Sequence, residues 1–173
     1  MPSNSMVLPF ALFAVALGAW SGVSIAAGGE DTATLKITGD GSQVHVDLRA
    51  PAVGLVGFAH APQTADERET LALAIENLKT GNGLVRFNAQ AECLLEKADI
   101  DSNPAPKGKA QGELGASYLF HCDQPTRLGS AALGIFLGFP ALSRAHVHYN
   151  VAGAAGEAIL TPINPVVSFI PLR

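Results

Sequence analysis

The side chains with the most evident capacity for chemistry are five histidines, and two of them are spaced for a metal ion. His146 and His148 lie two residues apart in a stretch typical of a strand, so both side chains point to the same face. Their roots then lie about 7 Å apart, and zinc favours imidazole nitrogen as a ligand. The pair predicts a Zn²⁺ site, and the same pattern also fits a solvated strand face.

Two imidazoles do not complete the coordination of zinc, so a third ligand has to come from a neighbouring strand. His45 and Asp47 are candidates, because the alternation of residues 44–48 turns both away from the core. A carboxylate elsewhere on the sheet is another source. His45 also fits a position that faces solvent and binds nothing.

His60 is the remaining candidate metal ligand, at the end of the proline-bounded stretch 51–62. Its alternative role is structural: a ring nitrogen bonds a backbone carbonyl and fixes the turn into the following helix. The fifth histidine, His121, is expected to be exposed.

The two cysteines, Cys93 and Cys122, lie in stretches that are typical of consecutive strands. A hairpin that pairs Ile100 with Gly115 brings the two cysteines opposite each other, with the polar segment 101–113 as its loop. We therefore predict a cross-strand disulfide, which an oxidising compartment favours. A thiol metal site is disfavoured, because the sequence has no C-x-x-C motif.

The start of the chain predicts export. The first 26 residues carry no charged side chain, and residues 7–20 form an apolar run of the length found in signal peptides. Ser24 and Ala26 are small, as cleavage after Ala26 requires. We expect a signal peptide at residues 1–26 and one domain at residues 27–173; the alternative is an uncleaved N-terminal anchor.

The rest of the composition narrows the function. All 11 basic and 15 acidic residues follow residue 26, for a net charge of −4. This mixed, mildly acidic pattern gives no reason to expect nucleic acid or an anionic membrane surface as a partner. The mature chain is expected to stay off the membrane, because no second apolar run reaches spanning length. No nucleophile elbow, H-E-x-x-H motif or phosphate loop is present, so we expect no enzyme.

The elements that must position these residues follow from periodicity. Two alternating runs, residues 34–38 and 44–48, predict a hairpin. Thr64 and Glu67 form a capping box for a helix with a stripe of Leu71, Ile75 and Leu78. Further strands are expected at residues 84–87, 92–100, 114–122, 131–139, 144–151, 157–161 and 166–170, with a flexible turn at 152–156. The fold class is therefore α+β, with largely antiparallel sheets of about seven to eight strands, one long amphipathic helix and one cross-strand disulfide.

Several short motifs then keep a recognisable order along residues 27–173. They are LRAP at 48–51, LVGFAHAP at 55–62, AEC at 91–93, YLFHC at 118–122, FLGFP at 136–140 and LTP at 160–162. In this order they resemble the ZrgA-type zinc-regulated periplasmic zinc-binding proteins. The resemblance implies a periplasmic protein that binds zinc, assists zinc acquisition or buffering without turnover, and hands the metal to a component of a zinc uptake system.

The chain departs from that family where its members carry histidine-rich tracts. Residues 28–32 and 101–113 contain no histidine, and the position before His60, usually Glu, is Ala59. These departures leave a second function open: a structural or partner-binding periplasmic scaffold of the same fold that has lost metal binding.

Overall fold

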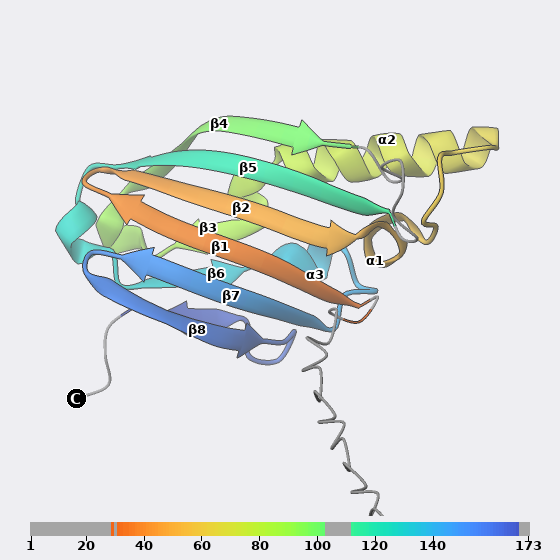
Figure 1. The fold of residues 1–173 in the computed structure, drawn as a ribbon. Helices are drawn as coiled ribbons and strands as arrows, with labels where there is room; N and C mark the ends of the chain where they lie inside the picture. The colour runs from red at the N-terminus through yellow and green to blue at the C-terminus, as the bar shows by residue number, and fades with distance from the viewer. Residues whose placement is uncertain (1–28, 30, 103–111, 170–173) are drawn as a thin grey trace, which may run out of the picture.

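The structure, a computed structural model, describes residues 29, 31–102 and 112–169. Within this part, nine strands form two sheets (Figure 1). The strands are β1 (Thr32–Asp40), β2 (Gln43–Pro51), β3 (Val85–Phe87), β4 (Cys93–Asp101), β5 (Glu113–Cys122), β6 (Ser130–Leu133), β7 (Arg144–Val151), β8 (Ala154–Leu160) and β9 (Val166–Ser168). The helices are α1 (Ala52–Val56), α2 (Ala65–Lys79) and α3 (Ile135–Gly138), joined by the 3-10 turns η1 (Gly81–Gly83), η2 (Ala89–Ala91) and η3 (Pro125–Arg127).

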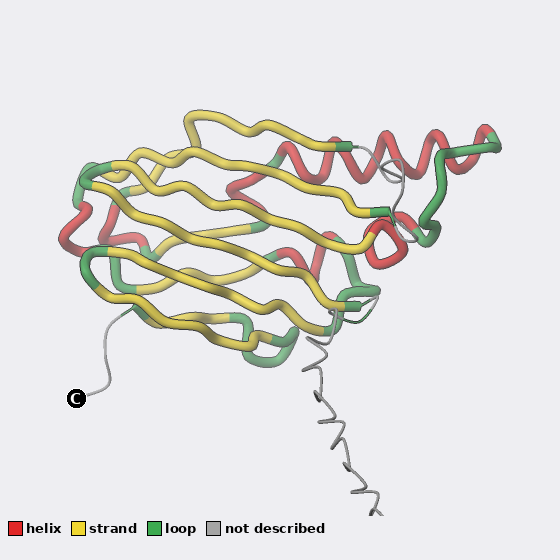
Figure 2. The backbone as a smooth tube through the Cα atoms, viewed as in Figure 1, coloured by secondary structure: helices red, strands yellow, loops and turns green. Residues whose placement is uncertain are grey.

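The larger sheet has the strand order β4-β5-β2-β1-β7-β8, and the smaller one has the order β3-β6-β9. The smaller sheet and α3 cover one face of the larger sheet, and the other face carries no described helix or strand (Figure 2). Every strand pair is antiparallel except β1 with β7, which run parallel. The chain enters β7 from the second layer, and such a crossover is what parallel neighbours require.

The prediction of a largely antiparallel sheet protein with helices is confirmed in outline, and three details need correction. The described residues form nine strands, not seven or eight, and the larger sheet is mixed because of the β1–β7 pair. The helix α2 spans 15 residues, which is an ordinary length. Of its predicted stripe only Leu78 is fully buried, together with Ala74, and Leu71 and Ile75 are half-buried.

The core lies between the two layers. Alternate residues of β1 and β2 point inward, as predicted, and Leu35, Ile37 and Val46 have no exposed surface. Phe87 of the smaller sheet meets Phe120 of the larger one edge-on, with ring centroids 5.1 Å apart. This packing leaves the larger sheet with one buried face and one solvent-exposed face.

The disulfide prediction is confirmed, but the predicted strand register is correct only near the cysteines. Cys93 is bonded to Cys122 and lies directly opposite it in the β4–β5 ladder. A β-bulge between Leu95 and Lys97 then shifts the pairing by one residue, so Ile100 pairs with Ala116 and not with Gly115.

The helix α2 begins at the predicted capping box. The Thr64 hydroxyl accepts the Glu67 N–H at 3.1 Å, and the Glu67 carboxylate accepts the Thr64 N–H at 3.1 Å. At the other end, the Tyr118 hydroxyl donates to the Leu78 carbonyl at 2.6 Å. Burial raises the pKa of Tyr118, and its hydrogen bond fixes the end of the helix to the sheet.

Two local predictions fail for identifiable reasons. Residues 131–139 form β6 and then α3 rather than one strand, because the chain turns at Gly134. The turn predicted at 152–156 is only Ala152-Gly153, both with positive φ, and β8 begins at once. The proline-bounded stretch 51–62 contains the short helix α1, for which Pro51, the last residue of β2, is the N-cap.

The predicted signal peptide lies outside the described residues, as does most of segment 101–113. In the described part of the chain, no helix combines the length and apolar character needed to cross a membrane.

Candidate metal site on the open face of the larger sheet

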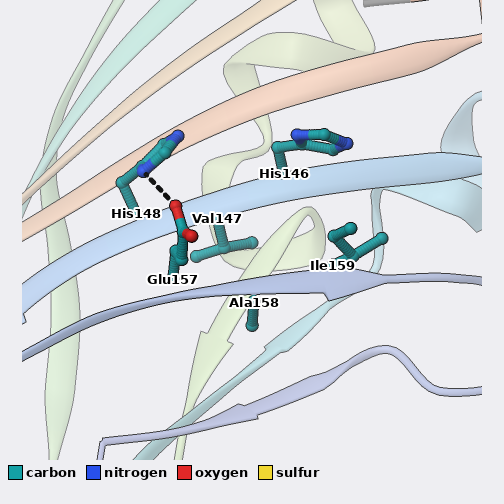
Figure 3. Close-up of a pocket in the computed structure, with 6 residues that line it drawn as sticks. All are labelled: His146, Val147, His148, Glu157, Ala158 and Ile159. Atoms are coloured by element: carbon teal, nitrogen blue, oxygen red, sulfur yellow. Dashed lines mark ion pairs between the residues drawn. The ribbon is translucent and has the colours of Figure 1, made fainter.

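The β7 strand presents its two histidines as the alternation predicts. Ala145 and Val147 are fully buried. His146 and His148 are exposed on the face of the larger sheet that no described helix or strand covers, which we call the open face (Figure 1). Figure 3 shows both imidazoles rising from the same side of the strand. The pair therefore stands on a rigid support whose other face is the protein core.

The position of β7 is fixed at its start by Asp31. The backbone carbonyl of Asp31 accepts the N–H groups of Ser143 and Arg144 at 2.9 and 3.3 Å. The Ser143 hydroxyl donates to the Asp31 carboxylate and is the main reason why the pKa of Asp31 is lowered. Because the pKa of Asp31 is lower in the folded state, its hydrogen bond with Ser143 stabilises the fold at pH values above the unfolded-state pKa. That stabilisation is lost as the pH falls through the folded-state pKa.

The adjacent strand β8 adds a carboxylate. Glu157 is the cross-strand neighbour of His148, and Ile159 is that of His146. The Nδ1 atom of His148 lies 3.6 Å from Oε2 of Glu157 (Figure 3). The side chains of His148 and Glu157 are 55% and 81% exposed, so the pair contributes little to stability and both groups remain open to a ligand.

These groups surround a shallow hollow of about 180 Å³ between β7 and β8. Its lining consists of His146, Val147, His148, Glu157, Ala158 and Ile159. The donor set, two imidazoles and one carboxylate, is one that zinc accepts.

The geometry is partly suited to zinc. Two atoms bound to one tetrahedral zinc at about 2 Å each are roughly 3.4 Å apart, close to the 3.6 Å between His148 and Glu157. Within the described ranges, however, no three histidine, cysteine or carboxylate groups already converge as a metal site. His146 would have to rotate to join the pair, which its exposed position allows.

The structure does not bring His45 or Asp47 to this pair. His45 is across from Thr38, and Thr38 is across from Asn150 of β7, so a whole strand intervenes. Two strand spacings amount to about 10 Å. Asp47 is separated in the same way by Lys36, and it accepts the Ser117 hydroxyl at 2.8 Å.

His60 lies in the loop between α1 and α2. Its Nδ1 is 3.0 Å from the Ala61 carbonyl, its ring stacks on Phe58 at 5.3 Å, and its Nε2 is 3.7 Å from Glu67. The N–H groups of Gln63 and Thr64 lower the pKa of Glu67 and keep it an anion beside the ring. These contacts match the structural role for His60, because they fix the entry into α2. The helix packs at the β4 side of the sheet, several strands from β7.

His121 points out from β5, with its Nε2 3.5 Å from Asp123 and its side chain 42% exposed. The residue that sequence reasoning did not name is Glu157. Its place opposite His148 follows from the tight Ala152-Gly153 turn, which fixes the β7–β8 register. Reading those two residues as the turn would have identified it.

The fold and these side chains define a two-layer, disulfide-linked β-sheet protein with a candidate zinc site on its open face. The sequence model of the family described as "ZrgA family zinc uptake protein" matches residues 29–169. The chain therefore belongs to the ZrgA family, and the resemblance seen in the sequence motifs is confirmed. No curated protein matches the chain.

Proposed function

We propose that this protein is an exported zinc-binding accessory protein that captures or buffers zinc in the periplasm and catalyses no reaction. The observation that carries the proposal is the set of candidate ligands on the open face. Within it, Nδ1 of His148 and Oε2 of Glu157 are 3.6 Å apart, close to the distance between two ligand atoms on one zinc ion. His146 is the third ligand, after rotation of its side chain. The membership of a zinc uptake family and the disulfide both support an exported zinc protein.

The surroundings of the site favour exchange over permanent retention. The ligands are exposed, and Lys36 stands beside His148 on β1, where its positive charge opposes a bound cation. Such a site releases its ion readily, which suits transfer of zinc to a component of an uptake system.

Calorimetric titration of the purified protein with zinc tests the proposal. We expect binding in the micromolar range at about pH 7.5 and a clearly lower affinity at about pH 5.5, because protons compete with zinc for imidazole nitrogen. A similar affinity at both pH values would contradict a histidine site.

The double substitution His146→Ala plus His148→Ala is expected to remove the tight zinc binding, because only one of the three ligands then remains. His121→Ala is the matched control, since it removes another exposed strand histidine beside a carboxylate and should leave the affinity unchanged. Retained affinity in the double variant would move the site to His45 or His60, which His45→Ala and His60→Ala would separate.

The alternative function is a structural or partner-binding scaffold of the same fold. It is favoured by the lack of a converged three-ligand group in the described residues. No heat of zinc binding at either pH would support the scaffold.

A further inference from the structure

An open hollow of about 250 Å³ lies between β3, the edge strand of the smaller sheet, and β4, an edge strand of the larger one. Its lining consists of Val85, Arg86, Phe87, Cys93 and Phe120. Val85 and Phe120 are buried and Arg86 is exposed, so the hollow leads from solvent into the space between the two sheets. One sulfur of the disulfide therefore lies at an opening of the core.

The two sulfurs of the disulfide differ in access. Cys93 is half-buried and lines the hollow, whereas Cys122 has no exposed surface. Exchange between a thiol and a disulfide requires that a thiolate reach one of the two sulfurs. The hollow provides that access to Cys93, which leaves Cys122 as the sulfur that departs.

Arg86 gives this hollow a positive charge. It is the one charged residue of the lining, and within the described residues its side chain makes no ion pair or hydrogen bond. Arg49 and Arg144, by contrast, pair with carboxylates. The nearby carboxylates of Glu92 and Asp123 are exposed and are not part of the lining. A guanidinium without a counterion attracts an incoming thiolate and favours its anionic form.

We propose that Cys93 is a site of thiol–disulfide exchange with a small anionic thiol that enters the hollow past Arg86. The thiolate attacks Sγ of Cys93, the bond to Cys122 breaks, and a mixed disulfide forms on Cys93. Cys122 leaves as a thiolate and takes a proton from water. A second thiolate then attacks the sulfur of the small thiol in the mixed disulfide and releases Cys93 as a thiolate. In sum, two small thiols are oxidised to their disulfide and the protein disulfide is reduced.

The strand register makes the first step reversible. Cys93 and Cys122 lie directly opposite each other in the β4–β5 ladder. Cys122 is therefore held next to the mixed disulfide, and its thiolate can attack Cys93, restore the bond and expel the small thiol. The volume of the hollow suits a small thiol, since it lies below the roughly 300 Å³ at which drug-sized ligand sites begin. The exchange is separate from the zinc proposal, because β4 and β8 are opposite edges of the larger sheet.

The first test identifies the attacked sulfur in the wild-type protein. The oxidised protein is mixed briefly with mercaptoethanesulfonate, quenched with acid and excess maleimide, and its peptides are analysed by mass spectrometry. We expect the small thiol on Cys93 and the maleimide on Cys122 of the same molecules. An adduct of the small thiol on Cys122, or equal amounts on both cysteines, would overturn the proposal.

The second test measures the contribution of Arg86 to the rate of reduction in the folded protein. Arg86→Gln should slow reduction by mercaptoethanesulfonate about fivefold, the effect of one pair of charges roughly 4 Å apart in water. Reduction by cysteamine should change much less, because its ammonium group offsets the charge of its thiolate.

Arg127→Gln is the matched control. Arg127 is another exposed arginine that makes no ion pair within the described residues, and it does not line this hollow. Its substitution removes the same charge and should leave both rates unchanged. Equal slowing of the two thiols by Arg86→Gln, no slowing of either, or an equal effect of Arg127→Gln would each overturn entry past Arg86.

Discussion

Removal of the disulfide is expected to lower the free energy of unfolding by about 3–4 kcal/mol, from the loop-entropy dependence on loop length. The bond joins residues 29 positions apart in the sequence, so its loss releases a loop of that length in the unfolded chain. In a domain of this size such a loss lowers the melting temperature by roughly 10 °C. The effect should be among the largest available from substitutions remote from the candidate site.

The measurement is urea unfolding of three samples: the oxidised protein, the same protein reduced, and the Cys93→Ala plus Cys122→Ala variant. Cys122 is fully buried, so the variant also loses packing and should be the least stable. The reduced protein isolates the contribution of the bond. Equal urea midpoints for oxidised and reduced protein would contradict the prediction.

Gly134→Ala is expected to destabilise the fold by about 1–3 kcal/mol or more, in the range of overpacked sites. A Cβ atom at this position would lie 2.0 Å from the backbone carbonyl oxygen of Gly83. A backbone atom cannot rotate away as a side chain does, so the junction between β6 and α3 must shift. That shift disturbs the hydrogen bond from the Gly134 N–H to the Leu84 carbonyl, now 2.8 Å long.

Gly83→Ala is the matched control on the opposite side of the same contact. Its added Cβ would meet only the Thr80 hydroxyl, at 3.4 Å. We expect thermal unfolding to separate the two variants clearly, with Gly83→Ala near the wild type. Equal melting temperatures for Gly134→Ala and Gly83→Ala would show that η1 and α3 do not approach each other as closely as described.

The disulfide and the junction at Gly134 both help to keep the larger sheet and its second layer in place behind the open face. The disulfide joins β4 to β5, and the hydrogen bond from the Gly134 N–H to the Leu84 carbonyl joins the start of α3 to the segment before β3. The histidines need no supporting contacts among themselves, because the buried face of β7 fixes their positions.

Several features were determined by local sequence alone. The period of two in residues 44–48 and 144–148 settled which side chains enter the core, including the common face of His146 and His148. Thr64 and Glu67 settled where α2 begins, since both partners of the capping box lie within four residues. The two cysteines settled the pairing of β4 with β5 at their ends, although the bulge after Leu95 carries no clear signal in the sequence.

Only the tertiary structure decided which strands are neighbours. Alternation is a property of one strand, whereas strand order depends on contacts between distant segments, such as the parallel pairing of β1 with β7. That order placed β1 between His45 and His148 and so separated two residues that share a face. The same order left β8 at the edge of the sheet, with Glu157 beside His148 and no described strand hydrogen-bonded to its outer side. The sequence thus named candidate ligands, and the topology decided which of those side chains lie near one another.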